Sequence, residues 1–296
     1  MRFIFTVAVA ALAAAGCTPA TPYRYSAMVP AARPIPFDGR TADPGDVRVE
    51  GAVSKSTVVT NHTPELHDTA VWVPQTQVDG SATIAVSKKI EVGGRFSYAS
   101  YDWARPSASG TMPFPTRPTL IGAGPEVRAA FPLDREGRFT FGLAFNFMQY
   151  RLPIAQWTKT DACGAGQTCY VDHATGSFGD GTTYRLDSQR LESKWTWALG
   201  LYPTYAFGPS GRYGHLIGHV GWHEGFQNDG FTDTTSSNGA VKSAGSITIL
   251  GLGYGFRWKP LRLSAMGFAP LTSSRSPVSY LMGALITVGC DLELFG

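Results

Sequence analysis

Three histidines spaced four residues apart are the residues whose types and spacing could most directly do chemistry. They are His215, His219 and His223, and glycines lie between them. On a helix, His215 and His219 could bind one metal ion, but the glycines favour a strand. Four strand residues span about 13 Å, which is too far for shared coordination. We therefore predict no metal site and a ladder of histidines lining a β-structure, each free to meet a carboxylate. A pH-sensitive interior is a further hypothesis, because histidine titrates near neutrality.

The rest of the sequence contains no recognisable set of catalytic residues. In the run Gly251-Leu-Gly-Tyr-Gly-Phe the glycines alternate with apolar residues and no P-loop lysine follows, which indicates a strand with a glycine inner face. The aspartates between residues 153 and 192 lack EF-hand spacing, and no Gly-x-Ser-x-Gly motif occurs. We expect no catalytic residue, no metal and no cofactor.

The composition is typical neither of a helical membrane protein nor of a nucleic-acid-binding protein. The 296 residues include 34 Gly, 7 Trp, 12 Tyr and 17 Phe, and the net charge is +3. The mean hydropathy is -0.06. Lysine and arginine form no cluster that could follow a phosphate backbone, so no nucleic-acid partner is expected.

From residue 46 onward, segments of alternating apolar and polar residues are joined by connections that are alternately short and long. The expected strands are 46–59, 69–87, 90–103, 117–132, 138–152, 193–207, 213–227, 244–257, 261–270 and 278–295. Short periplasmic turns and long external loops, such as 153–192, are typical of transmembrane barrels. The pattern predicts an all-β fold, an antiparallel up-and-down transmembrane β-barrel of about ten strands, with eight to twelve allowed. Segment 69–87 is the weakest, because Pro74 and the turn-like Val78-Asp79-Gly80 could divide it.

The better strands have one apolar face and one small or polar face. Between residues 139 and 147 the apolar face carries Phe139, Phe141, Leu143, Phe145 and Phe147. The opposite face carries Thr140, Gly142, Ala144 and Asn146. A soluble β-sandwich would turn its aromatic residues inward and cover its outer face with charge. The barrel is therefore preferred, and a soluble β-sandwich lipoprotein acting as a binding module is the alternative.

Strand parity places ionisable side chains of both signs on the inner face. Besides the three histidines, the expected lumen-lining residues are Arg48, Glu50, Glu91, Arg95, Glu126, Arg128, Arg257, Arg262, Asp291 and Glu293. A ten-stranded barrel is narrow. We therefore expect these charges to pair across the interior as a structural network. A narrow polar conduit or a ligand cup is the alternative.

The first residues have the form of a secretory signal peptide. Arg2 precedes the apolar run from Phe3 to Ala15, which is too short to span a membrane as a helix. The run ends in Ala14-Ala15-Gly16-Cys17, which resembles the bacterial lipobox. The resemblance implies that residues 1–16 are removed and that Cys17 becomes the acylated first residue, held in lipid by its acyl chains. Secretion with cleavage nearby, without lipidation, is the alternative.

Residues 17–45 separate this signal from the barrel domain at 46–296. They show little periodic hydrophobicity and contain Pro19, Pro22, Pro30, Pro34, Pro36 and Pro44. This composition predicts an extended, poorly ordered linker. A small plug or an arm packed on the barrel is the alternative.

The remaining cysteines divide by context. Cys163 and Cys169 flank the flexible run Gly164-Ala-Gly-Gln-Thr, which can close a small disulfide ring in an oxidising compartment. The alternative, two thiols of a metal site, lacks further ligands at suitable spacing. Cys290 is left unpaired on a strand.

Residues 46–296 resemble the bacterial outer-membrane β-barrel proteins as an architectural class, without a single family. Together with the lipobox, the resemblance implies a lipid-anchored, integral protein of the bacterial outer membrane with a structural, adhesive or narrow-pore role. The implied partners are outer-membrane lipid, the barrel-insertion machinery, and a small solute or surface ligand. The last strand of such proteins usually ends on an aromatic residue, whereas here Phe295 is penultimate.

An outer-membrane enzyme is the least favoured hypothesis. Ten strands is also the number in the omptin proteases, and Asp229, Asp233 and His223 lie near one expected loop. The paired Asp-x-Asp and Asp-x-His motifs of that family are absent, so no catalytic role is assigned to these residues.

Overall fold

The computed structural model describes residues 23–60, 71–101, 119–171, 183–208, 212–228, 241–271 and 283–293. None of these residues forms a helix long and apolar enough to cross a membrane. The strands are β1 (Tyr23–Ala27), β2 (Val47–Thr60), β3 (Val71–Ser87), β4 (Ile90–Tyr101), β5 (Thr119–Pro132), β6 (Phe139–Thr160), β7 (Cys169–Val171), β8 (Thr183–Ala206), β9 (His215–Asn228), β10 (Val241–Trp258), β11 (Leu261–Leu271) and β12 (Gly283–Leu292).

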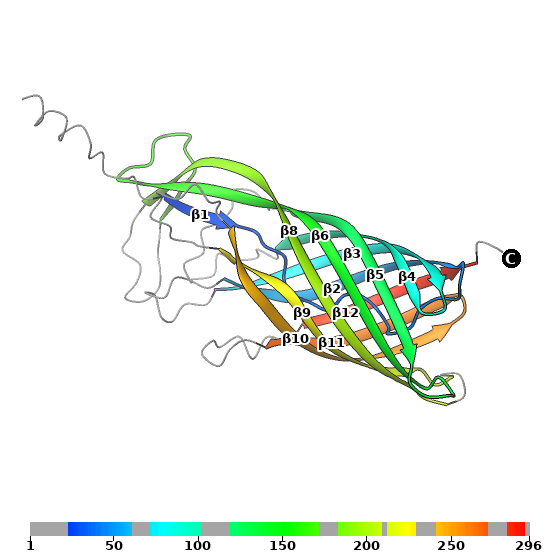
Figure 1. The fold of residues 1–296 in the computed structure, drawn as a ribbon. Coiled ribbons are helices and arrows are strands. Elements are labelled where there is room, and N and C mark those ends of the chain that lie inside the picture. Colours follow the sequence, from blue (N-terminus) through cyan, green and yellow to red (C-terminus); the bar gives the residue numbers. More distant parts are fainter. Residues whose placement is uncertain are drawn as a thin grey trace, which may run out of the picture.

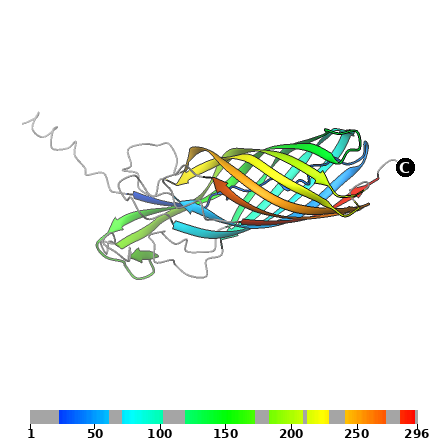
Figure 2. The ribbon, with the colours of Figure 1, turned by 90° about the horizontal axis from the view of Figure 1, so that it is seen from below.

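Ten of these strands form a closed antiparallel barrel, which confirms the predicted fold. Every strand except β1 and β7 pairs with its neighbours around the cylinder, and β12 pairs with β2 to complete it. Short turns join the strands at one end, where β12 also finishes, and the strand ends that the longer connections join lie at the other (Figure 1). The view from below shows the same elongated cylinder (Figure 2). Closure pairs both edges of the sheet, so the cylinder has no free edge strand.

The segment that carries the turn-like residues is one continuous strand. β3 pairs with β2 without interruption from Val71 to Ile84, and Asp79 and Gly80 lie inside this ladder. The described pairing of β3 with β4 begins at Gln75 opposite Tyr101. Pro74 lies just beyond that pair, so its missing N–H interrupts no described pair on that side.

The outer face of the barrel is apolar, and the aromatic residues predicted on one face of β6 and β8 point outward. Phe145 is 40% exposed and Trp195 is 49% exposed, whereas the alternate residues Ala144 and Thr196 are buried. In water such a surface would be unfavourable, because exposed apolar patches of this extent mark contact with a partner or a membrane.

Aromatic rings gather at both ends of this apolar face. Toward the long loops, the rings of Phe147 and Trp195 stack with their centroids 4.8 Å apart. Toward the short turns, neighbouring rings form the row Tyr205, Phe207, Tyr254, Phe256 and Trp258. On a strand tilted by about 40°, the ten-residue separation of Trp195 from Tyr205 is about 25 Å along the barrel axis. That height matches the apolar band between the aromatic girdles of transmembrane barrels.

The prediction of a loop over residues 153–192 is wrong, because β6 and β8 continue far into it. Residues 152–160 pair with residues 183–192, and β1 lies along the other edge of β6. The described pairs of β5 with β6 end at Arg151, so β1 occupies the edge of β6 that β5 leaves free. We call this extension, with β7, the arm (Figure 1). Residues 185–192 are polar except for Leu186 and Leu191 and show no alternation, which is why the pattern that identifies membrane strands does not reveal them.

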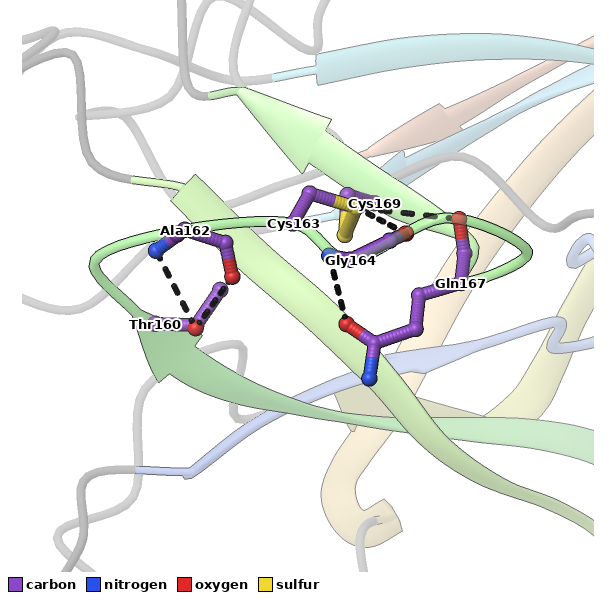
Figure 3. Close-up of a disulfide and its surroundings, with 6 residues drawn as sticks. All are labelled: Thr160, Ala162, Cys163, Gly164, Gln167 and Cys169. Carbon is purple, nitrogen blue, oxygen red and sulfur yellow. Dashed lines mark hydrogen bonds between the residues drawn. A yellow bond between two sulfur atoms is a disulfide. The ribbon is translucent and has the colours of Figure 1, made fainter.

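The predicted disulfide lies near the tip of the arm. Cys163 and Cys169 are bonded, and the side chain of Gln167 accepts a hydrogen bond of 2.9 Å from the Gly164 N–H (Figure 3). Thr160 donates its hydroxyl to the carbonyl of Ala162 at 2.8 Å. The ring therefore connects the end of β6 to β7, which pairs with β8. Cys290 is a half-buried free thiol, and Cys17 and Phe295 lie outside the described residues.

Residues 28–46, which we call the lumen segment, run through the interior of the barrel. The segment leaves β1 at the long-loop end and reaches β2 at the short-turn end, where the Gly45 N–H donates to the carbonyl of Ala85. Met28, Ile35 and Phe37 are at most 3% exposed. This course corrects the expectation of a poorly ordered linker for residues 28–45, whereas residues 17–22 lie outside the described part. The segment forms no ladder, so its sequence has no hydrophobic period.

Candidate functional site

The candidate site is the barrel lumen, and we call the region nearest the long loops its upper part. There the side chain of Arg33 meets Asp79 of β3, with Nη2 2.5 Å from Oδ1 and Nε 3.2 Å from Oδ2. Both side chains are buried. Gln75 accepts a hydrogen bond from the Ala31 N–H at 2.8 Å and donates one to the carbonyl of Val29 at 3.0 Å. One wall side chain thus satisfies two backbone groups of the segment, as buried polar groups require.

The middle of the lumen segment packs against aromatic and glycine residues of the wall. Tyr202 of β8 donates its hydroxyl to the carbonyl of Ile35 at 2.6 Å, and its ring meets the edge of Phe37 at a centroid distance of 5.3 Å. Gly142 of β6 allows the backbone of Gly39 to approach closely, because a Cβ at position 142 would lie 2.7 Å from the Gly39 Cα. Gly39 itself has a φ of +77°, which glycine adopts without strain.

The lower part of the segment is held by charged groups. Asp38 accepts a hydrogen bond of 2.8 Å from Arg262 of β11, which also donates to the carbonyl of Arg40 at 3.3 Å. At the short-turn face Lys259 donates a hydrogen bond to Asp43. This bond lowers the pKa of the Asp43 carboxyl and raises the pKa of the Lys259 amine. The segment is therefore fastened at several levels between its two ends.

The barrel wall around the lumen segment has an ion-pair network of its own. Glu126 of β5 accepts hydrogen bonds from Arg95 at 2.9 Å and from Arg128 at 2.5 Å. Arg128 also meets Glu50 of β2 at 2.5 Å, and Glu50 lies 3.8 Å from Arg48. All five side chains are almost fully buried. Each charge therefore has an opposite partner, which burial in a low-dielectric interior requires.

The network continues around the wall to β12 and β11. Arg48 lies 3.0 Å from Glu91 and 3.1 Å from Asp291. Asp291 in turn lies 2.6 Å from Arg262 and 3.2 Å from Arg257. Since Arg262 binds Asp38, the wall network and the lumen segment form one connected set of charges.

The structure places almost all of the expected lumen residues in the interior. The buried ones are Arg48, Glu50, Glu91, Arg95, Glu126, Arg128, Arg262, Asp291, His215, His219 and His223. Arg257 lies near the short-turn end with its side chain 23% exposed. Glu293 is exposed just beyond β12.

The three histidines lie on β9 along the inner wall. His219 packs against the Tyr202 ring at a centroid distance of 4.7 Å, and a Cβ at Gly221 would lie 2.6 Å from its Nε2. His215 lies in the same way over Gly255 of β10. The glycine inner face of these strands makes room for the imidazole rings. Among the described residues no three histidine, cysteine or acidic side chains are grouped as metal ligands.

A small cavity lies beside the lumen segment in its upper half. The cavity beside Arg33, Ile35, Arg95, Tyr150 and His223 has room for about one water molecule.

Sequence reasoning missed the residues that hold the segment, above all Arg33, Asp38 and Asp79. Asp79 could have been found from parity, because it shares a face of β3 with Gln75 and Gln77, both buried. The neighbouring Gly80 made it resemble a turn residue. Of the omptin-like candidates, Asp229 and Asp233 lie outside the described residues, and His223 is 4% exposed inside the lumen.

Comparisons with known proteins find likenesses of structure only. No protein-family model and no curated protein matches the chain. An outer membrane channel from Pseudomonas putida F1 is similar at 10% identity and a TM-score of 0.45, over 88% of this chain and 100% of the other. The autotransporter translocator domain of NalP from Neisseria meningitidis is similar at 9% identity and a TM-score of 0.37, over 86% and 91%. Neisserial surface protein A is similar at 8% identity and a TM-score of 0.31, over 84% and 96%.

Proposed function

We propose that this protein is an integral β-barrel of the bacterial outer membrane whose lumen is closed by its own N-terminal segment. It has a structural role and presents the arm and the long loops on the outer face. The apolar band of about 25 Å between two aromatic girdles supports insertion in a membrane. The short turns and long loops support an orientation with the turns in the periplasm.

The observation that carries the proposal is the burial of the lumen segment among polar wall residues. Side chains of β3, β4, β8, β10 and β11 bond to the segment, so it is surrounded by the wall. Any solute that passed through the barrel would have to displace these bonds. The structural role is therefore favoured over a permanently open pore.

A gated narrow pore is a second candidate, and the kind of contact that holds the lumen segment favours it. The segment is held by hydrogen bonds and ion pairs, all of which are reversible. If the segment left, the wall would expose charges of both signs: Arg48, Arg95, Arg128, Arg257 and Arg262 with Glu50, Asp79, Glu91, Glu126 and Asp291. A water-filled conduit of that composition would pass small polar solutes.

Planar-bilayer conductance separates these functions. The full-length protein, shown to be a closed barrel by a heat-dependent shift on a denaturing gel, should give no steady conductance. A variant lacking residues 28–41 that keeps the gel shift should conduct steadily. Steady conductance of the full-length protein would overturn closure, and voltage-dependent openings would favour the gated pore. Absence of the gel shift in the full-length protein would overturn the barrel itself.

A further inference from the structure

The course of the lumen segment determines on which side of the barrel the N-terminus lies. β2 begins at the short-turn end, so a chain without the segment would start there. Instead the segment crosses the interior, and β1 pairs with the arm beyond the long-loop end of the cylinder, with Tyr23 opposite Thr158 (Figure 1). The described chain therefore starts on the side opposite to the short turns.

The position of the chain is also fixed at the C-terminal end of β1. The Met28 N–H donates to the carbonyl of Pro153 at 3.0 Å, directly where the chain turns from the arm into the lumen. Ala27 lies opposite Ile154 in the ladder. The turn is thus bound to β6 above the point where β5 stops pairing with it.

Chain length then limits where Cys17 can lie. Five residues lie between Cys17 and Tyr23, and the six Cα–Cα steps of a fully extended chain span at most about 22 Å. Thr158, opposite Tyr23, is nine residues beyond Gln149, which pairs with the girdle residue Trp195. Nine strand residues at a tilt of about 40° rise at most about 23 Å above the girdle. Cys17 can therefore return to the near membrane surface, but the far surface is about 25 Å further away.

We propose that the barrel delivers its own N-terminus to the cell surface, so that the acyl chains predicted on Cys17 insert into the outer leaflet beside the long loops. The inference rests on the orientation given under the proposed function. The lipid surface is the partner, and the five-residue connection between Cys17 and β1 has about the length needed to reach it. The protein is then held in the membrane both by its barrel and, from outside, by its lipid.

The order of the segments explains how a free N-terminus could reach this place. The lumen segment is contiguous with β2 and runs antiparallel to it, with Asp43 to Asp46 forming the bend at the short-turn end. The segment and β2 can therefore cross the membrane together, as a hairpin, in the way that the long loops must cross. When β12 pairs with β2, the barrel closes around the segment, and no free end has to pass through a finished barrel.

The test uses the full-length protein with a site for a specific protease inserted between Ala20 and Thr21. Two matched controls carry the same site in the turn at Glu136-Gly137 and within residues 229–240, which connect β9 to β10. Cells are grown with an alkyne-tagged fatty acid, treated intact with the protease, and the acyl label on the barrel band is measured. Each variant is also shown to keep the heat-dependent gel shift.

We expect intact cells to be cut at the 20/21 site and at the 229–240 site, but not at the turn. The cut at 20/21 should remove most of the acyl label from the barrel band. If the 20/21 site is cut only after the outer membrane is permeabilised, while the 229–240 site is cut on intact cells, the inference is overturned and the proposed function stands. If the turn is cut on intact cells and the 229–240 site is not, the proposed orientation fails, and surface delivery fails with it. A cut at 20/21 without any acyl label overturns the anchor on Cys17.

Discussion

Replacing Asp79 by Asn should loosen the upper part of the lumen segment. The carboxylate of Asp79 binds the guanidinium of Arg33 through two hydrogen bonds, and the two side chains are 1% and 5% exposed. The hydroxyls of Ser97, at 3.4 Å, and of Tyr150 also contact Arg33, but neither carries a negative charge. In the variant the Arg33 charge would remain buried without a counter-charge.

The magnitude follows from the burial of the pair. Removing one partner of a buried ion pair destabilises by about 3–5 kcal/mol, because the other charge is left uncompensated. Since about 1.4 kcal/mol corresponds to a factor of ten, the population in which residues 28–36 are detached should rise by roughly two to three and a half orders of magnitude. The loss should be local, because Asp38 keeps its bond to Arg262 in the lower part of the segment.

Labelling of a cysteine at position 31 measures this population. Ala31 is 2% exposed, so in an Ala31→Cys variant, with Cys290→Ser as background, a hydrophilic maleimide reacts only when the segment opens. The Asp79→Asn change should increase the labelling rate about 100-fold or more, since 3 kcal/mol is about two factors of ten. An unchanged rate would refute the assignment of this pair as the upper attachment of the segment.

Two controls accompany this measurement. Glu136→Gln breaks the pair with Arg138, in which the side chains are 66% and 44% exposed, and should leave labelling unchanged. The double replacement Arg33→Met with Asp79→Leu removes both charges and should label more slowly than Asp79→Asn alone, because no unpaired charge remains buried.

Three other changes test the packing of the segment and the arm. Gly142→Ala should destabilise the barrel by about 1–3 kcal/mol, seen as a lower temperature of the gel shift, because its Cβ would lie 2.7 Å from the Gly39 Cα. Gly51→Ala is the matched control, since a Cβ there meets nothing within 4 Å. Tyr202→Phe should raise the labelling rate at position 31 by about five-fold, because it removes a bond worth about 1 kcal/mol. Cys163→Ser with Cys169→Ser should leave the gel shift unchanged and make the arm tip easier to cleave with trypsin on intact cells.

The barrel could be predicted from the sequence because a membrane imposes a simple rule on its strands. Residues such as Phe145 and Trp195 must face lipid while their neighbours face inward, and this leaves an alternation that can be read without an alignment. The same rule located the wall charges by parity. The apolar neighbours of Arg48 and Glu126 on their strands face outward, for example, so parity predicts that these two charged side chains face inward.

The lumen segment and the arm could not be predicted in this way, because neither faces lipid. Ile35 and Phe37 are buried, but they belong to a segment without regular secondary structure, so no period connects them. In the arm, the side chains at 187–191 are exposed to water, and polar residues there resemble a loop. What identifies both regions is pairing with distant residues, which a single sequence does not record.

The wall composition is better explained by the lumen segment than by a transported solute. A chain that crosses a narrow interior without forming a ladder leaves backbone N–H and C=O groups that must find partners. Gln75, Tyr202 and Arg262 bind such groups directly. In a wall that served a solute, the side chains of Gln75, Tyr202 and Arg262 would instead point into open space. Replacements of Gln75, Tyr202 or Arg262 should therefore change the fraction of molecules in which the lumen segment is detached, rather than the choice of solute that the barrel conducts.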